Sequence, residues 1–365
     1  MTSPAAGGLG AVITDMIRQD GPLPIDRYMQ LCLLHDPLGY YRRAETVGAA
    51  GDFITAPEVS QLFGELIGIW VAATWEAMGS PPRWRLIELG PGRGVMLTDM
   101  LRALAVLPPA LDGLEVVAVE ASPRLAAEQR RRLASVSVSI AWRERLPTSS
   151  TLPTILVANE LLDALPIRQL EREHGTWVER CVGLDASGAL RFEAAAPARD
   201  LRSRLPLTLA SAPEEAIIEC AEGAAALIDD IAALAGGDRL AALLIDYGYW
   251  GPATGDTLQA VRAHGYTSPL TAPGEADLSA HVDFAQVAQL ARLAGLTTYG
   301  PLAQAELLSR LGIGVRLERL LRDADARTAN RLEVGAARLM DPAAMGSRFR
   351  ALALASKGLP RLPVF

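Results

Sequence analysis

The sequence predicts an α/β fold built on a mostly parallel sheet. Strand-like apolar runs, mostly separated by helical segments, occur at residues 85–89, 114–120, 136–142, 154–159 and 240–245. Such alternation favours a parallel sheet with helices on both faces. Two later runs, at 296–299 and 349–355, would add a closing pair. We therefore expect a Rossmann-like sheet of seven strands.

The composition is that of an ordinary globular enzyme: half of the 365 residues are hydrophobic and 21% are charged. The formal net charge of −7 weighs against nucleic acid or an anionic membrane surface as a partner, and it suits a cationic substrate. No apolar run approaches the roughly 18–20 residues of a membrane span. The first residues resemble neither a signal peptide nor a transit peptide. We expect a cytoplasmic protein.

Cysteine and histidine spacing predicts no metal site. The three cysteines lie far apart and form no C-x-x-C motif, so we interpret Cys32, Cys181 and Cys220 as buried reduced thiols. The four histidines form no pair with the spacing typical of zinc ligands.

Residues 1–80 are expected to form an N-terminal helical segment, and residues 81–365 the sheet domain. Helices are predicted at 9–18 and 25–34, and a loop at 49–58 leads into a long apolar helix at 60–78. Three insertions decorate the sheet domain: a β-meander at about 166–213, a loop-rich stretch at 247–280 and helices at 302–343.

The turn after the first strand is a candidate ligand cradle. It reads Glu88-Leu-Gly-Pro-Gly-Arg-Gly94, with Gly90, Gly92 and Gly94 at alternate positions. Glycines let backbone N–H groups approach a ligand closely. A carboxylate at Glu88 would repel the pyrophosphate of a dinucleotide, and it suits a ligand with an ammonium and a sulfonium group, such as S-adenosylmethionine. A purely structural turn is the alternative.

The second strand ends in another acid, Glu120, at a position where a bidentate acceptor for ribose hydroxyls is expected. NAD sites share such an acid, so Glu120 alone does not separate the two cofactors. A helix cap or a solvated strand end is the alternative role. Ser122, followed by proline, offers a better cap.

The strand at 154–159 is followed by a third polar group. In a doubly wound sheet, Asn159 and Glu160 would lie beside the reactive end of the cofactor, with Asp163 one helical turn further on. Carboxylates can hold a cationic methyl acceptor, and two oxygens in a fork suit a guanidinium group. Capping of a helix by Asn159 and Glu160 is the alternative, and it is compatible with this role.

Two loops carry further polar residues. In the loop at 51–58, Asp52 and Thr55 are capable helix caps and Phe53 fits a core position, so this loop taken alone is interpreted as structural. Loops as long as the one after residue 246 usually cover a site or bind a partner. This loop holds four low-priority candidates: Gln259, His264, His281 and Asp283.

Taken together, these segments resemble the MidA-like family of S-adenosylmethionine-dependent methyltransferases, which includes a mitochondrial complex I assembly factor. Its motifs occur here in order between about residues 25 and 290: G-D-F-x-T-x-P-E, E-L-G-P-G-x-G, V-E-x-S-P, A-N-E-x-x-D-A-L-P, I-D-Y-G-Y, G-D-T-L-Q-A and P-G-E-A-D-L-x-x-H-V-D-F. The resemblance implies a class I methyltransferase fold. It also implies methylation of an arginine nitrogen in a protein, namely a subunit of respiratory complex I.

Residue by residue, the resemblance implies a cofactor side and an acceptor side. Together with Glu88, the cofactor side would comprise Gly90, Gly92, Gly94, Glu120, Asp52, Phe53, Thr55 and Glu58. The acceptor side would comprise Asn159, Glu160 and Asp163. The chain departs from the family at Glu219, which is followed by Cys-Ala where members tend to carry Ser-Pro, so the role of Glu219 stays open. Without a presequence, the chain looks like a bacterial cytoplasmic relative.

Two other functions remain open. A cofactor-binding assembly chaperone with little catalysis is compatible with the surface offered by the helical segment and the insertions. A nicotinamide-dependent oxidoreductase shares the glycine pattern. Glu88 and the lack of an evident histidine or lysine for hydride chemistry weigh against it. The acceptor protein, the number of methyl groups added and the oligomeric state are left open by the sequence.

Overall fold

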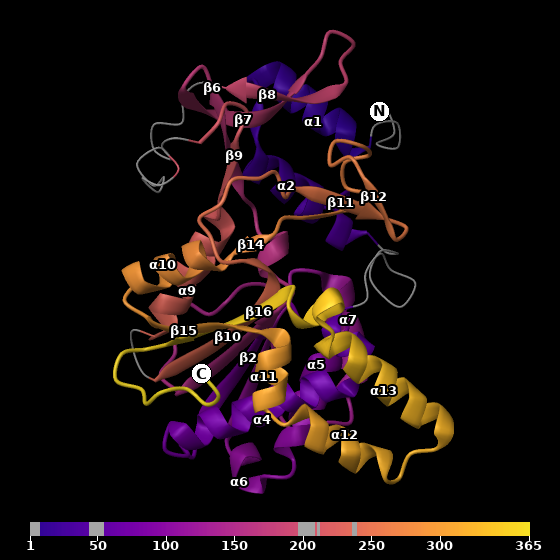
Figure 1. The fold of residues 1–365 in the computed structure, drawn as a ribbon, viewed down its shortest axis with the longest axis vertical. Helices are drawn as coiled ribbons and strands as arrows, with labels where there is room; N and C mark the ends of the chain where they lie inside the picture. Colours follow the sequence, from indigo (N-terminus) through magenta and orange to yellow (C-terminus); the bar gives the residue numbers. More distant parts are fainter. Residues whose placement is uncertain (1–7, 44–54, 196–208, 210–211, 236–238) are drawn as a thin grey trace. The chain divides into compact units, whose positions relative to one another are not determined.

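The computed structural model describes residues 8–43, 55–195, 209, 212–235 and 239–365. The chain forms two compact units that alternate along the sequence (Figure 1). The sheet unit comprises residues 54–162, 227–249 and 288–365, and the meander unit comprises residues 1–53, 163–226 and 250–287. These boundaries fall at 53/54 and 162/163 rather than near residue 80. The long helix at Gln61–Ala77 packs into the core of the sheet, so it belongs with the sheet.

The sheet unit has the predicted α/β fold. The main path of its sheet consists of β2 (Trp84–Leu89), β3 (Leu114–Val119), β4 (Ile140–Arg143), β5 (Thr154–Asn159), β10 (Leu240–Tyr249), β15 (Thr297–Ala303) and β16 (Phe349–Ala355). They run in the order β15-β16-β10-β5-β2-β3-β4. The five strands from β10 to β4 are parallel, whereas β16 is antiparallel to both β10 and β15. The expected closing pair is therefore confirmed.

Helices cover both faces of this sheet (Figure 1). They are α3 (Ala56–Val59), α4 (Gln61–Ala77), α5 (Val95–Leu104), α6 (Pro108–Leu111), α7 (Pro123–Arg132), α9 (Glu222–Ala235), α10 (Phe284–Leu293), α11 (Gln304–Arg310), α12 (Ile313–Leu321) and α13 (Ala326–Met340). The largest core cluster joins α4 and α5 to β2, with Trp70 and Trp84 fully buried. Ser60 caps α4 by accepting the Leu62 N–H at 3.3 Å, which explains why this apolar helix begins there.

Strand register brings the polar strand ends to one edge of the sheet. Leu89 at the end of β2 pairs with Val119 of β3 and with Ala158 of β5. Ile245 of β10 pairs with Asn159. Gly90, Glu120 and Glu160 therefore follow β2, β3 and β5 at nearly the same level, whereas β10 continues to Tyr249. The carboxyl edge of a parallel sheet is where ligands bind in such folds.

The meander unit contains the predicted meander and a small sheet that was not expected. Its first sheet has the order β1-β7-β6-β9 with β8 on β7, built from β1 (Leu23–Pro24), β6 (Arg168–Glu173), β7 (Thr176–Leu184), β8 (Leu190–Ala195) and β9 (Ile217–Cys220). Helices α1 (Leu9–Asp20) and α2 (Ile25–Leu34) share its core cluster. The three cysteines are buried and form no disulfide with one another, as interpreted.

The segment expected to be loop-rich folds as β11 (Gln259–Arg262), β12 (Gly265–Thr267) and β13 (Asp277–Ser279). The two-residue turn between β11 and β12 consists of Ala263 and His264, both with positive φ. Such hairpin turns normally use Asn or Gly, so the usual sequence signal was missing. His264 is therefore a turn residue. No helix in the described part of the chain combines the length and apolar character needed to cross a membrane.

Helix α4 provides a direct test of the sheet-unit core. Ile67 is fully buried, whereas Ile69 on the same helix is 40% exposed. Replacing Ile67 by Ala should lower the free energy of unfolding by about 2–5 kcal/mol, because a cavity remains in a packed core. The Ile69→Ala control should cost about 1 kcal/mol or less. Equilibrium denaturant unfolding measures both. Equal losses would contradict the packing of α4 described above.

Candidate active site

The glycine turn after β2 forms an open backbone cradle. Gly90, Gly92 and Gly94 have φ values of 61°, 55° and 76°, in the left-handed region that favours glycine. A Cβ added at Gly92 would meet no described heavy atom within 4 Å. Gly94 begins α5 as its N-cap, so the turn leads directly into a helix N-terminus. The turn therefore leaves space beside exposed backbone, as a ligand cradle requires.

Glu88 is a buried carboxylate with an unsatisfied oxygen. Its side chain is 1% exposed, and Oε2 has no hydrogen-bond partner among the described residues. Burial raises the pKa of Glu88 to about 8, and repulsion from Glu120 and Asp99 adds to this shift. Burying an unpaired carboxylate is costly unless a cation or a donor compensates it. This position therefore fits a cationic ligand group and disfavours an anionic one.

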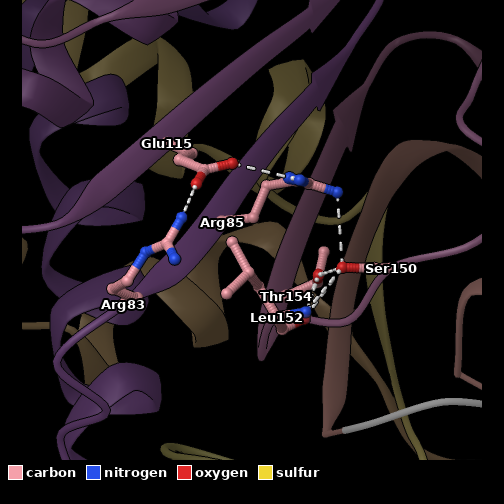
Figure 2. A network of polar contacts seen from close by, with 6 residues as sticks. All are labelled: Arg83, Arg85, Glu115, Ser150, Leu152 and Thr154. Carbon is pink, nitrogen blue, oxygen red and sulfur yellow. Dashed lines mark hydrogen bonds and ion pairs between the residues drawn. The ribbon is translucent and has the colours of Figure 1, made fainter.

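Glu115, near the amino ends of β2 and β3, is a paired carboxylate that can be compared with Glu88. Figure 2 shows Glu115 of β3 held by Arg83 at 2.8 Å and by Arg85 at 3.1 Å. These two hydrogen bonds lower the pKa of Glu115. Arg85 also reaches the Ser150 hydroxyl at 3.3 Å, and Ser150 lies 3.1 Å from Thr154 (Figure 2). Glu88 and Glu115, on adjacent strands, thus have pKa shifts of opposite sign.

Glu120 is tied to the cradle by a buried amide that sequence reasoning missed. Its Oε1 accepts the Ser122 N–H at 2.8 Å, and its Oε2 accepts the Gln129 Nε2–H at 3.0 Å. The same Gln129 nitrogen donates to the Gly92 carbonyl at 2.8 Å. Ser122 caps α7 by accepting the Leu125 N–H at 3.4 Å, as predicted. Gln129 could not be singled out from sequence, because a glutamine within a helix forms no motif.

One of the predicted loop residues that the structure describes, Glu58, contacts the cradle. Thr55 precedes α3 as its N-cap residue, and Glu58 in α3 accepts from Arg93 of the cradle at 3.4 Å. Arg93 also donates to Glu128 of α7 at 2.8 Å, and this bond raises the pKa of Arg93. The ion pairs therefore connect α3, the cradle and α7. The other two predicted loop residues, Asp52 and Phe53, lie outside the described residues.

Asn159 and Glu160 form a strained polar pair at the end of β5. Glu160 adopts a φ of 50°, which is unusual for a residue with a side chain and clusters at functional sites. Glu160 Oε1 accepts the Ala56 N–H at 2.8 Å and the Asn159 Nδ2–H at 3.1 Å. Asn159 Oδ1 is buried without a hydrogen-bond partner in the described structure. That oxygen is available to a donor on a ligand.

The turn after β5 is capped by another carboxylate, whereas Glu160 accepts the N–H of Ala56 at the start of α3. Asp246 of β10 is fully buried, and its Oδ2 accepts the N–H groups of Leu161 at 3.0 Å and Leu162 at 2.8 Å. These donors lie at the start of the short 3-10 turn Leu162–Ala164. Asp246 therefore fixes the turn after β5, and Glu160 makes its helix contact with α3 instead of with this turn.

The remaining candidates belong to the meander unit. Asp163 is its first residue in the segment 163–226, and its carbonyl accepts the Ala280 N–H at 2.9 Å. Glu219 accepts the Thr257 N–H at 2.9 Å and the Gln169 amide at 2.9 Å. Burial raises the pKa of Glu219 and these hydrogen bonds lower it, with burial the larger effect. These contacts give Glu219 a structural role.

Three candidates from the long loop also make structural contacts. Asp283 accepts the Ala285 N–H at 2.9 Å and the Gln286 N–H at 3.2 Å, so it caps α10. The His281 N–H donates to the Thr257 hydroxyl at 2.8 Å, and burial lowers the pKa of the His281 imidazole. Gln259 donates to the Ser279 hydroxyl at 3.3 Å, which joins β11 to β13.

The fold and this arrangement of the site define a class of enzyme. Residues 66–302, which include the acid before the glycine turn and the second acid after β3, match a family model for S-adenosyl-L-methionine-dependent methyltransferases. The chain belongs to this methyltransferase family. The open glycine turn and the unpartnered Glu88 oxygen fit a cofactor that carries cationic groups.

Within that family, the chain is similar to proteins named as arginine methyltransferases. It is 33% identical to the Drosophila melanogaster homologue of the mitochondrial protein arginine methyltransferase NDUFAF7, over 95% of this chain and 85% of that protein. The human protein arginine methyltransferase NDUFAF7 is also 33% identical, over 93% of this chain and 81% of its own length.

A solved structure has the same fold. A crystal structure from Burkholderia thailandensis bound to S-adenosyl-homocysteine superposes with a TM-score of 0.85 at 29% identity, covering 98% of this chain and 93% of that one. A native structure from the same organism has a TM-score of 0.84 at 30% identity, covering 98% and 94%. These structures confirm the predicted methyltransferase fold.

The raised pKa of Glu88 predicts how stability depends on pH. The folded pKa of about 8 exceeds the ordinary value of 4.5, so the folded state holds the proton between these values and stability falls as pH rises through this window. Glu88→Gln should raise the free energy of unfolding by about 1–3 kcal/mol at pH 9, with little change at pH 4. Denaturant unfolding across this pH range measures the difference.

The matched control is Glu115→Gln, which removes the paired carboxylate shown in Figure 2. Its lowered pKa places its contribution at acidic pH, where stability is lost as the carboxylate protonates. The control should therefore show no alkaline gain. A Glu88→Gln variant that is destabilised at pH 9 would contradict the assignment of Glu88 as an unpaired buried acid.

Proposed function

We propose that this chain transfers a methyl group from S-adenosylmethionine to an arginine nitrogen of a protein. The observation that carries the proposal is the placement of Glu88 and the Asn159–Glu160 pair on adjacent parallel strands. Glu88 pairs in register with Val157, two residues before Asn159. An unpaired acid for the cofactor and an oxygen pair for the acceptor therefore lie at one sheet edge.

The cofactor side is assigned by charge and space. In this proposal, Gly90, Gly92 and Gly94 line the cofactor with their backbone, and Glu88 compensates its ammonium group. Glu120 accepts from the ribose hydroxyls, because a carboxylate can accept several hydrogen bonds. The α3 side contributes Thr55 and Glu58, and we extend it to Asp52 and Phe53 on the family resemblance.

The acceptor side is assigned by hydrogen-bond chemistry. When bound, S-adenosylmethionine supplies a methyl group on a cationic sulfur. Asn159 Oδ1 and the Glu160 carboxylate accept from a guanidinium group and turn one nitrogen lone pair toward that methyl carbon. The new N–C bond forms as the C–S bond breaks, and the nitrogen then loses a proton. We assign Asp163 to this side on the family resemblance.

Arginine as the acceptor rests on three supports. The relatives are named protein arginine methyltransferases. The net charge of −7 suits a cationic acceptor. A fork of carboxylate and amide oxygens also matches guanidinium geometry. We further propose, from the family resemblance, a complex I subunit as the acceptor and a bacterial, cytoplasmic setting.

Ligand binding tests the cofactor side. Calorimetry should show that the wild type binds S-adenosylmethionine and S-adenosyl-homocysteine. Gly92→Ala should weaken both by at least ~10-fold, because a Cβ fills the open face and strains a backbone with positive φ. Gly175→Ala is the control, since Gly175 also has positive φ and open surroundings but lies in the β6–β7 turn. No binding by the wild type at millimolar ligand would refute the proposal.

Catalysis tests the acceptor side. A proteome from cells lacking the protein serves as the acceptor pool, with arginine methylation read by mass spectrometry. Glu160→Gln should reduce methylation by ~10²-fold or more while cofactor affinity changes by less than ~3-fold, because the charge that orients the acceptor is lost. Glu76→Gln, on the exposed face of α4, should be neutral. A wild type that binds the cofactor but methylates no protein would favour the assembly chaperone instead.

A further inference from the structure

We infer that Trp142 and Gln129 are positioning residues that hold Glu120 in the orientation required to bind the cofactor ribose. This inference rests on the proposed function, because it takes Glu120 as the ribose acceptor. It adds a residue pair from α7 and β4 that no sequence motif marks.

Both the nitrogen and the oxygen of the Gln129 side-chain amide form hydrogen bonds in this arrangement. One Nε2–H donates to the Gly92 carbonyl at 2.8 Å and the other to Glu120 Oε2 at 3.0 Å. Its Oε1 accepts the Trp142 Nε1–H at 3.1 Å. The side chain is fully buried. A fully satisfied buried amide has one low-energy position, so it can serve as a rigid brace.

The partners allow only one orientation of the amide. Both groups facing Nε2 are acceptors, namely a carbonyl and a carboxylate, and the group facing Oε1 is an indole N–H, which can only donate. A flipped amide would place oxygen against two acceptors and NH2 against a donor. Trp142 therefore selects the orientation in which Gln129 donates to Glu120.

Packing holds this brace in place. The Arg130 guanidinium carbon lies 5.0 Å from the centre of the Trp142 ring, a cation–π arrangement that keeps the indole against α7. A Cβ at Gly94 would lie 3.3 Å from Gln129 Cγ, so the glycine permits α7 to approach the cradle. The cradle, the acid after β3 and the end of β4 thus share one side chain.

The consequence is a coupling between the two ends of the cofactor site. Gln129 joins the Gly92 backbone in the glycine turn to the Glu120 carboxylate at the ribose position. Without the amide, Glu120 keeps the Ser122 N–H contact at 2.8 Å on its other oxygen, but the Gln129 hydrogen bond to Oε2 is lost. Discrimination for the ribose hydroxyl should therefore depend on Gln129 and, through it, on the Trp142 N–H.

The test compares two ligands across matched variants. Calorimetry gives the affinities of S-adenosyl-homocysteine and its 2′-deoxyribose analogue, and their ratio measures the contribution of the 2′-hydroxyl. We expect the wild type to prefer the ribose form by ~10-fold, the value of a hydrogen bond to a charged group. Gln129→Leu and Trp142→Phe should reduce that ratio at least ~3-fold. Trp142→Phe keeps an aromatic ring and removes the N–H. This variant therefore still tests the inference if Gln129→Leu fails to fold.

Trp84→Phe is the control, because the Trp84 indole lies in the same sheet but is fully buried and donates to the Ala110 carbonyl at 2.8 Å. It should lose stability and leave the ratio unchanged. Equal weakening of both ligands by Trp142→Phe would overturn the inference, because it would show a merely structural role. A wild type that binds both ligands equally would also overturn it. Failure of the wild type to bind S-adenosyl-homocysteine would refute the proposed function itself.

Discussion

The register of the parallel strands is the constraint on which the site depends. Leu89 pairs with both Val119 and Ala158, so β2, β3 and β5 end within one residue of each other, and Asn159 pairs with Ile245 of β10. A shift of one residue would turn each side chain to the other face. The apolar core between α4, α5 and the sheet fixes this register, because only one register buries Trp84 and Leu86. Core packing thereby determines which side chains lie at the carboxyl edge of the sheet.

The same edge collects features that oppose folding. Glu88 is buried with an unpartnered oxygen, Asn159 has a buried oxygen without a partner in the described structure, and Glu160 has a positive φ. Burial also raises the pKa of Asp99, next to this group, to about 6. Features of this kind persist where the surrounding structure over-determines them, and they mark sites under functional constraint. The stable core supplies the free energy that offsets them.

Sequence reasoning recovered the elements whose signals are local. The structure contains the predicted strands at 85–89 and 154–159, the cap at Ser122 and the closing pair. These features could be predicted because alternation, capping chemistry and spacing each depend on a few neighbouring residues. The hairpin at Ala263-His264 was missed, because its turn uses residues that rarely adopt positive φ.

Long-range contacts could not be predicted in the same way. Asp246 caps a turn 84 residues away, and Gln129 reaches Gly92 across 37 residues. Either residue alone has no sequence pattern, and its role exists only once the strand ends meet. The acceptor side depends on such long-range contacts more than the glycine turn does. The sequence motifs therefore indicate the cofactor class more directly than they indicate the acceptor.

Glu88 of β2 and Glu115 of β3 illustrate a functional and a structural role for carboxylates in the same sheet. Glu115, at the amino ends of these strands, has arginines on both oxygens and a lowered pKa. Glu88, at the carboxyl end, has a raised pKa and an oxygen left without a protein donor among the described residues. If Glu88 served only stability, a paired or apolar residue would serve better, because replacing unpaired buried charge is usually stabilising. An acid retained in this state, beside an open glycine turn, is therefore best explained by a cation that arrives with the ligand.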